Sequence, residues 1–239
     1  MISQLIKKGF TKIAPDKLDK FIMYLIVGML VGARTFYVFI YNFDLFPWEF
    51  FSVWNCGLSF HGAFVGMIIA AVLFAKSEGV PVRMMYDTIC LAVAPGLFFG
   101  RIGNFINGEL YGRITSMPWG VVFPDGGPLP RHPSQLYEAF FEGIVLFFLM
   151  WFVVRKRVKN YGTISCVFVL IYAVERFVLE FFREPDVQMG RYFFETVTMG
   201  QILCSLMIIL AVVSFWIFSR HPISIVHEGT LRKKAKKRR

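Results

Sequence analysis

The residues best suited to chemistry lie in the run from Gly100 to Arg113, Gly-Arg-Ile-Gly-Asn-Phe-Ile-Asn-Gly-Glu-Leu-Tyr-Gly-Arg, which directly follows the apolar segment 89–99. Polar groups at membrane depth are costly and usually face a cavity or a partner. Arg101 and Asn104 are three residues apart, and the glycines around them allow close approach and left-handed turns. A broken helix end offers free backbone N–H groups to an anion. The run therefore predicts either an anion site or a helix end with polar capping.

A second charged group lies further along the chain, where Arg176, Glu180 and Arg183 are spaced four and three residues apart. On a helix these three residues share one face, so Arg176 and Glu180 can pair. One interpretation is a structural ion pair between helices. The other is a phosphate site, because the planar guanidinium fork fits phosphate oxygens and stays protonated. Glu175 points away from this face.

Histidines and paired glutamates provide the remaining candidates. His61 begins an apolar segment, where it is either a hydrogen-bonded core residue or a proton-transfer group. His132 precedes another apolar segment and is a candidate for capping. Glu138 and Glu142 share a helix face, and they belong either to the site or to bonds with Tyr and backbone groups.

The elements that position these residues are long apolar helices. The chain has 239 residues, of which 56% are hydrophobic, 28 of them Phe. About 20 apolar residues cross a membrane core. No secretory signal fits, because the first long apolar run lacks a small-residue cleavage site and contains Arg34. We therefore expect an all-α, polytopic membrane bundle with about six spans, at residues 20–41, 59–76, 86–105, 135–155, 161–182 and 197–218.

Charge orients the bundle. Most lysines and arginines lie in residues 1–19, in the loops after 76 and 155, and in a tail that ends Arg-Lys-Lys-Ala-Lys-Lys-Arg-Arg. The other loops contain only Arg113, Arg131, Arg183 and Arg191. The positive-inside rule then places both termini in the cytoplasm. In so apolar a chain the basic tail, 219–239, predicts contact with anionic membrane lipids rather than with nucleic acid.

The proline-rich loop 106–134 is too long for a simple turn, and we expect a mostly irregular cap on the outer face. The four cysteines have no metal-binding spacing, and neither a metal nor a soluble cofactor is implied. The expected organisation is thus a cytoplasmic segment 1–19, a membrane domain 20–218 and a basic tail 219–239.

The order of these motifs resembles the prolipoprotein diacylglyceryl transferase family of the bacterial inner membrane. The resemblance runs from about residue 20 to 218, and its central run is highly specific. The matching stretches are Gly32-Ala-Arg34, Gly57 to Gly62, Gly100 to Arg113, Pro118 to Pro124, Arg131 to Glu138, Arg176 to Asp186 and Thr198-Met-Gly-Gln201.

The resemblance implies transfer of a diacylglyceryl group from phosphatidylglycerol to the lipobox cysteine thiol of a prolipoprotein. This reaction forms a thioether and releases glycerol phosphate. The family implies that Arg101 and Arg176 bind the phosphate, with Arg183 and Gly112 as further lipid-binding candidates. Asn104, Glu109 and Gly112 lie in its functional motif. It also implies that Glu180 orients Arg176 and that His61 is the candidate proton acceptor.

One departure concerns the N-terminus. Family members usually have seven spans, and the first carries a functional tyrosine in a Trp-Tyr-Gly-like context. Residues 1–19 contain no tyrosine. We expect either a sequence that starts downstream of the true start or a six-span variant. In the variant, Tyr24 and Tyr37 are the candidates to replace the functional tyrosine of the family's first span. The alternatives to the transferase are a non-catalytic phospholipid-binding or transport protein and an inactive truncated relative.

Overall fold

The computed structural model describes residues 1–7, 9–41, 43, 50–52, 57–184, 191–192 and 197–225. The basic tail from residue 226 onward, and Pro185 and Asp186 of the resembling stretch, lie outside the described residues. The described chain forms two compact units, one within residues 1–88 and the other within residues 89–225. Each unit is described by itself.

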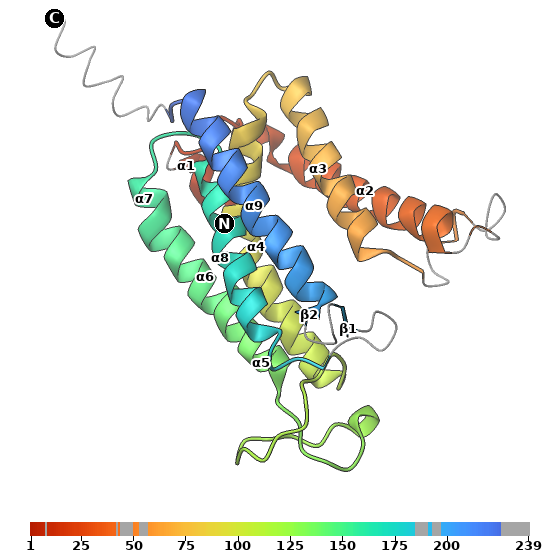
Figure 1. Cartoon of the computed structure of the whole chain (residues 1–239). Coiled ribbons are helices and arrows are strands. Elements are labelled where there is room, and N and C mark those ends of the chain that lie inside the picture. Colours follow the sequence, from red (N-terminus) through yellow and green to blue (C-terminus); the bar gives the residue numbers. More distant parts are fainter. Residues whose placement is uncertain are drawn as a thin grey trace, which may run out of the picture. The chain divides into compact units, whose positions relative to one another are not determined.

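The first unit is built on two helices, α2 (Leu18–Phe36) and α3 (Phe60–Ser77), which run side by side (Figure 1). A short helix, α1 (Ile2–Lys7), precedes them, and a π-helical turn, Tyr37–Tyr41, extends α2. Glycines allow the two helices to touch: a Cβ at Gly32 would lie 2.3 Å from the Gly62 backbone oxygen. Such small-residue contacts are typical of membrane helices.

The second unit contains the rest of α4 (Val82–Ile106), which begins in the first unit, and three further helical rods. One rod runs from Ser134 to Arg157 as α5 (Ser134–Glu138), α6 (Leu146–Phe148) and α7 (Arg155–Arg157), joined by π-helical segments Ala139–Val145 and Leu149–Val154. The others are α8 (Thr163–Leu179) and α9 (Met199–Arg220). Strands β1 (Arg191–Tyr192) and β2 (Val197–Thr198) form a short antiparallel pair before α9.

The helical prediction is confirmed, since a helix lies at each of the six expected positions. Four of them are long and apolar enough to cross a membrane: Pro15–Ile40, Val82–Ile106, Ser134–Arg157 and Met199–Arg220. The described chain thus belongs to a multi-pass membrane protein.

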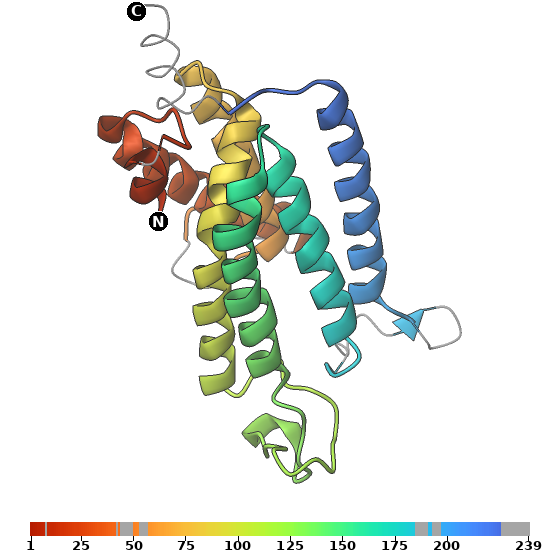
Figure 2. The same ribbon diagram turned by 90° about the vertical axis from the view of Figure 1, so that its left-hand side faces the viewer.

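Residues 107–133 form a largely irregular cap, as expected, with one 3-10 turn at Pro124–Gly126. The cap joins the C-terminal end of α4 to the start of α5, so it lies at one end of the second unit (Figure 1 and Figure 2). Backbone bridges tie Gly112 to Arg183 and Ile114 to Arg131. The first bridge attaches the cap to the segment after α8, and the second joins two strands of chain within the cap.

Candidate functional site

Three arginines from two parts of the second unit, the end of α4 and the end of α8 with the turn after it, meet at its cap end. Arg101 lies near the end of α4, Arg176 lies on α8, and Arg183 follows α8. Their side chains are only 17%, 13% and 11% exposed. The sequence predicted that Arg101 and Arg176 bind the phosphate and that Arg183 is a further lipid-binding candidate, and the fold brings the three side chains together.

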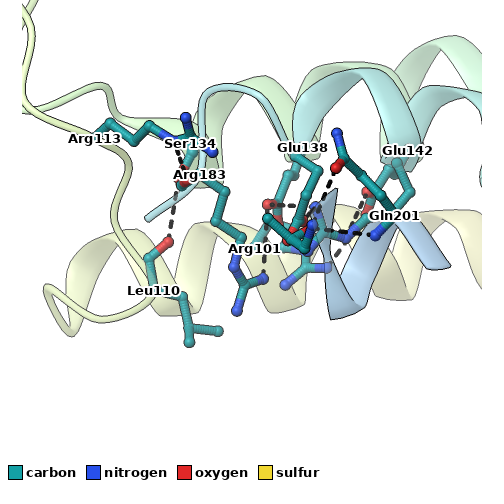
Figure 3. Close-up of polar contacts among 11 residues, drawn as sticks. Arg101, Leu110, Arg113, Ser134, Glu138, Glu142, Arg183 and Gln201 are labelled. Atoms are coloured by element: carbon teal, nitrogen blue, oxygen red, sulfur yellow. Dashed lines mark hydrogen bonds and ion pairs between the residues drawn. The ribbon is translucent and has the colours of Figure 1, made fainter. Parts of the chain in front are cut away.

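Glu138 lies at the centre of this cluster. Its Oε2 is 2.8 Å from Arg101 Nε, and its Oε1 is 3.6 Å from Arg176 Nη1 and 3.9 Å from Arg183 Nη1. Figure 3 shows Arg101, Glu138 and Glu142 converging, with Arg183 beside them. The sequence left the role of Glu138 and Glu142 open; the structure places both carboxylates against the arginines.

Two further glutamates, Glu142 and Glu180, form ion pairs with the arginines. Glu142 Oε2 accepts a hydrogen bond of 3.4 Å from Arg101 Nη2, and its Oε1 is 3.9 Å from Arg176 Nε. The expected pair between Arg176 and Glu180 is present, at 2.7 Å between Nη1 and Oε2. Three cations thus face three carboxylates, Glu138, Glu142 and Glu180, which are 1%, 0% and 5% exposed. Pairing of this kind offsets much of the cost of burying each charge.

Most of these contacts are ion pairs rather than directed hydrogen bonds. Both oxygens of Glu138, and the close Arg176 Nη1 and Glu180 Oε2 atoms, lack a hydrogen-bond partner of good geometry within the described chain. The Arg176 guanidinium is therefore held largely by charge, and its Nη1 makes no hydrogen bond of good geometry within the described chain. Glu175 forms no ion pair with them among the described residues, as its position on the helix predicted.

Asn104 and Glu109 lie at the other side of the α4 terminus. Glu109 Oε1 accepts hydrogen bonds from Asn104 Nδ2 at 2.9 Å and from Asn107 Nδ2 at 3.2 Å. These two bonds lower the pKa of Glu109 below its ordinary value. Glu109 is thus an exposed, ionised carboxylate beside two amides, in the specific run that the sequence singled out.

The backbone that carries Glu109 is strained and held from α5. Leu110 has a φ of +57°, which is uncommon for a leucine. Gln135 Nε2 donates to the Glu109 carbonyl at 2.7 Å. Ser134 Oγ donates to the Leu110 carbonyl at 3.2 Å, as Figure 3 shows. Ser134 and Gln135 are fully buried, 1% and 0% exposed. Nothing in the sequence signals this support, because the positive φ is visible only in the fold.

Gly112 occupies a position where no side chain fits. A Cβ there would lie 2.5 Å from the Phe182 carbonyl oxygen and 2.6 Å from that of His132. The backbone N–H of the next residue, Arg113, donates a hydrogen bond of 2.9 Å to the Phe182 carbonyl, and its Nε–H donates one of 2.9 Å to the Arg183 carbonyl. The close approach at Gly112 therefore connects the cap to the segment that carries Arg183.

The two histidines lie in different settings. His132 belongs to the cap end, where its Nδ1 is 3.1 Å from the Tyr137 hydroxyl, which also accepts a hydrogen bond from Trp119 Nε1 at 2.6 Å. His61 belongs to the first unit, in the exposed first turn of α3, whose N-cap is Ser59. Arg34, which lies in the first predicted span, is buried in the first unit and donates to the carbonyls of Phe50 at 2.9 Å and Gly57 at 3.1 Å.

Comparison with known proteins identifies the group of enzymes to which these features belong. The family model for prolipoprotein diacylglyceryl transferase matches residues 1–217. A phosphatidylglycerol–prolipoprotein diacylglyceryl transferase of Nitratidesulfovibrio vulgaris strain DP4 is 47% identical over 198 residues, which is 82% of this chain and 75% of the relative. The enzyme of the same name from Brucella anthropi is 46% identical over 208 residues, covering 85% of this chain and 74% of the relative. The chain belongs to the prolipoprotein diacylglyceryl transferase family.

Proposed function

We propose that, in this phosphatidylglycerol–prolipoprotein diacylglyceryl transferase, Arg101, Arg176 and Arg183 bind the phosphate group of the phosphatidylglycerol substrate. The observation that carries the residue assignment is the convergence at one buried place of three guanidinium groups, one from α4 and two from α8 and the turn directly after it. Family membership supplies the activity, a step of lipoprotein biosynthesis, and the two substrates. The convergence supplies the chemistry that the phosphate ester needs.

The reaction breaks the S–H bond of the thiol and a carbon–oxygen bond of the lipid, and it forms a C–S bond and a bond between the proton and a base. The cysteine sulfur of the prolipoprotein attacks the glycerol carbon of the diacylglyceryl group, the C–S bond forms, and the carbon–oxygen bond to the phosphate breaks. The bonding electrons leave with that oxygen, which becomes part of glycerol phosphate, and the thiol proton passes to a base. Cationic groups aimed at the phosphate stabilise the charge that grows there in the transition state.

The remaining roles are assigned on the family pattern. We assign His61 as the proton acceptor, because a thiol with a pKa near 8.5 needs help to ionise. Glu180 orients Arg176 through their 2.7 Å ion pair. Asn104, Glu109 and Gly112 shape the lipid-binding edge at the end of α4, where Glu109 holds the two amides in place.

We also propose that the cap end faces the periplasm and that the chain spans the bacterial inner membrane six times, with α3 and α8 as the shorter spans. Aromatic and basic side chains at the opposite end of the second unit support this orientation. Arg155 lies 4.6 Å from the Trp151 ring and Arg220 lies 4.0 Å from the Trp216 ring. Such pairs are typical of a membrane interface, and their positive charge favours the cytoplasmic side and its anionic lipids over nucleic acid. Residues 1–19 and 219–239 are then the cytoplasmic segments that flank the membrane domain.

The test is transfer by the purified protein in lipid nanodiscs, with acyl-labelled phosphatidylglycerol and a lipobox peptide. The wild type is expected to form a thioether product, and a peptide with serine in place of cysteine is expected to form none. Arg101→Ala is expected to lower kcat/KM by about 100-fold or more, as loss of one transition-state donor does elsewhere. The matched control is Arg157→Ala, an exposed arginine at the end of α7. Equal turnover in the two variants would contradict the phosphate role of Arg101.

A further inference from the structure

The stretch Thr198-Met-Gly-Gln201 has no role in the chemistry above, yet it touches the cluster directly. Thr198 Oγ1 donates a hydrogen bond of 2.9 Å to Glu180 Oε1. Thr198, Glu180 and Gln201 are 4%, 5% and 5% exposed, so this contact is shielded from water. Glu180 in turn pairs with Arg176, so a chain of two contacts joins α9 to a candidate phosphate-binding arginine.

Thr198 performs two tasks with one hydroxyl. As the N-cap of α9 it accepts a hydrogen bond from the Gln201 backbone N–H at 3.2 Å, and the Gln201 side chain accepts from the Thr198 N–H at 3.1 Å. This reciprocal capping box fixes the first turn of the helix. The hydroxyl proton is then left for the Glu180 carboxylate, because a hydroxyl has one donor and two lone pairs. Gln201 lies beside the arginine–glutamate cluster (Figure 3).

Gly200 provides the space for the carboxylate. A Cβ at residue 200 would lie 2.6 Å from Glu180 Oε1, 2.7 Å from its carboxyl carbon and 2.9 Å from Oε2. The Glu180 carboxylate therefore occupies the volume that any other side chain would fill at this position. It also lies against the first turn of a 22-residue helix, whose positive end favours a negative charge.

We propose that Thr198 and Gly200 are positioning residues of the transferase: the first turn of α9 fixes the Glu180 carboxylate, and Glu180 aims the Arg176 guanidinium at the phosphate. This inference rests on the proposed role of Arg176. Neither residue touches the substrate; they act by denying Glu180 any other position. Moving the carboxylate by about 1 Å moves the guanidinium with it, and errors of that size cost about 100-fold in rate elsewhere.

The test separates capping from positioning at Thr198. Thr198→Ser keeps both the cap and the donor, and is expected to keep kcat within about threefold of wild type. Thr198→Asp caps a helix at least as well as threonine, but it has no proton to donate to Glu180 and repels it. It is expected to lower kcat about 10- to 100-fold, with a smaller change in KM for phosphatidylglycerol, because the arginine acts chiefly on charge that develops in the transition state.

Gly200→Ala gives a second, independent perturbation. The added methyl group displaces the end of the Glu180 side chain rather than any backbone atom, so the protein is expected to fold while kcat falls at least tenfold. The matched control is Gly96→Ala on α4, where a Cβ meets nothing within 4 Å. That variant is expected to turn over like wild type.

Double variants test whether Thr198 and Gly200 act on Arg176 through Glu180. In a Glu180→Gln background, Thr198→Asp and Gly200→Ala are expected to cause less than a threefold further loss, because residues in one network are not additive. Full additivity in that background, or wild-type kcat in both single variants, would overturn the inference. Wild-type turnover by Arg176→Ala would instead overturn the proposed function on which it rests.

Discussion

Replacing Glu138 with glutamine is expected to destabilise the second unit more than any single surface change. The substitution keeps the shape of the side chain but removes the negative charge that faces three guanidinium groups. Its ion pairs with Arg101, Arg176 and Arg183 have distances of 2.8, 3.6 and 3.9 Å. At an effective dielectric constant near 20, these distances correspond to roughly 6, 5 and 4 kcal/mol of attraction.

Most of that attraction is offset in the native protein. Burying four charges costs several kcal/mol each, the arginines repel one another, and Glu138 repels Glu142. The net loss on breaking a buried pair is about 3–5 kcal/mol, because one cation is left without full compensation. We therefore expect the free energy of unfolding to fall by about 3–5 kcal/mol in Glu138→Gln.

The assay is thermal unfolding in detergent, followed by a thiol-reactive dye, because Cys166 and Cys204 are only 6% and 3% exposed in the folded chain. The matched control is Glu184→Gln. Glu184 is 44% exposed at its side chain and forms one 3.0 Å pair with Arg131. An exposed pair contributes about 0–1 kcal/mol. Equal midpoints for the two variants would refute the view that Glu138 holds the arginines together.

Two further predictions concern the cap end. Asn107→Ala is expected to raise the pKa of Glu109 toward its ordinary value of 4.5, because one of the two hydrogen bonds that lower it is removed. Since the pKa of Glu109 is lowered in the folded state, its stabilisation is present above the unfolded pKa and is lost as pH falls through the folded pKa. NMR titration of the carboxylate measures the shift caused by Asn107→Ala. An unchanged pKa would contradict the prediction. Gly112→Ala is expected to lower the unfolding midpoint and to lower kcat/KM at least tenfold. The reason is that the added Cβ meets two backbone oxygens, at 2.5 and 2.6 Å, that cannot rotate away. Gly96→Ala, in open space, serves as its control in both measurements, and similar behaviour of the two variants would exclude the close approach.

Local contacts in the site were readable from the sequence, and contacts between helices were not. The pair of Arg176 and Glu180 follows from their four-residue spacing, because such residues share a helix face. Glu138 and Glu142 have the same spacing, but spacing alone does not say what that face meets. Which helix packs against it depends on the rotation of α5 and of the π-helical segment after it, and that rotation is a property of the whole bundle.

The supports of the site were harder still to predict. Ser134 and Gln135 hold a turn with a positive φ at Leu110, and a leucine gives no sign of that conformation. Thr198 and Gln201 are readable as a capping box, since threonine is followed three residues later by glutamine. The second use of the Thr198 hydroxyl, as a donor to Glu180, requires the position of another helix.

The pairing of three arginines with three glutamates bears on how such a site can both fold and react. Three unpaired guanidinium groups at membrane depth would oppose insertion, and each costs about 2.5–3.5 kcal/mol on insertion scales. Glu138, Glu142 and Glu180 neutralise them within the protein, so the cluster can be buried. Under the proposed function, the same carboxylates weaken the attraction for a phosphate diester that carries one charge. The charge on the phosphate grows as glycerol phosphate leaves, and the attraction grows with it. An arginine cluster that is partly neutralised by glutamates therefore stabilises the transition state more than the bound lipid. This difference is the condition for raising kcat rather than only tightening binding.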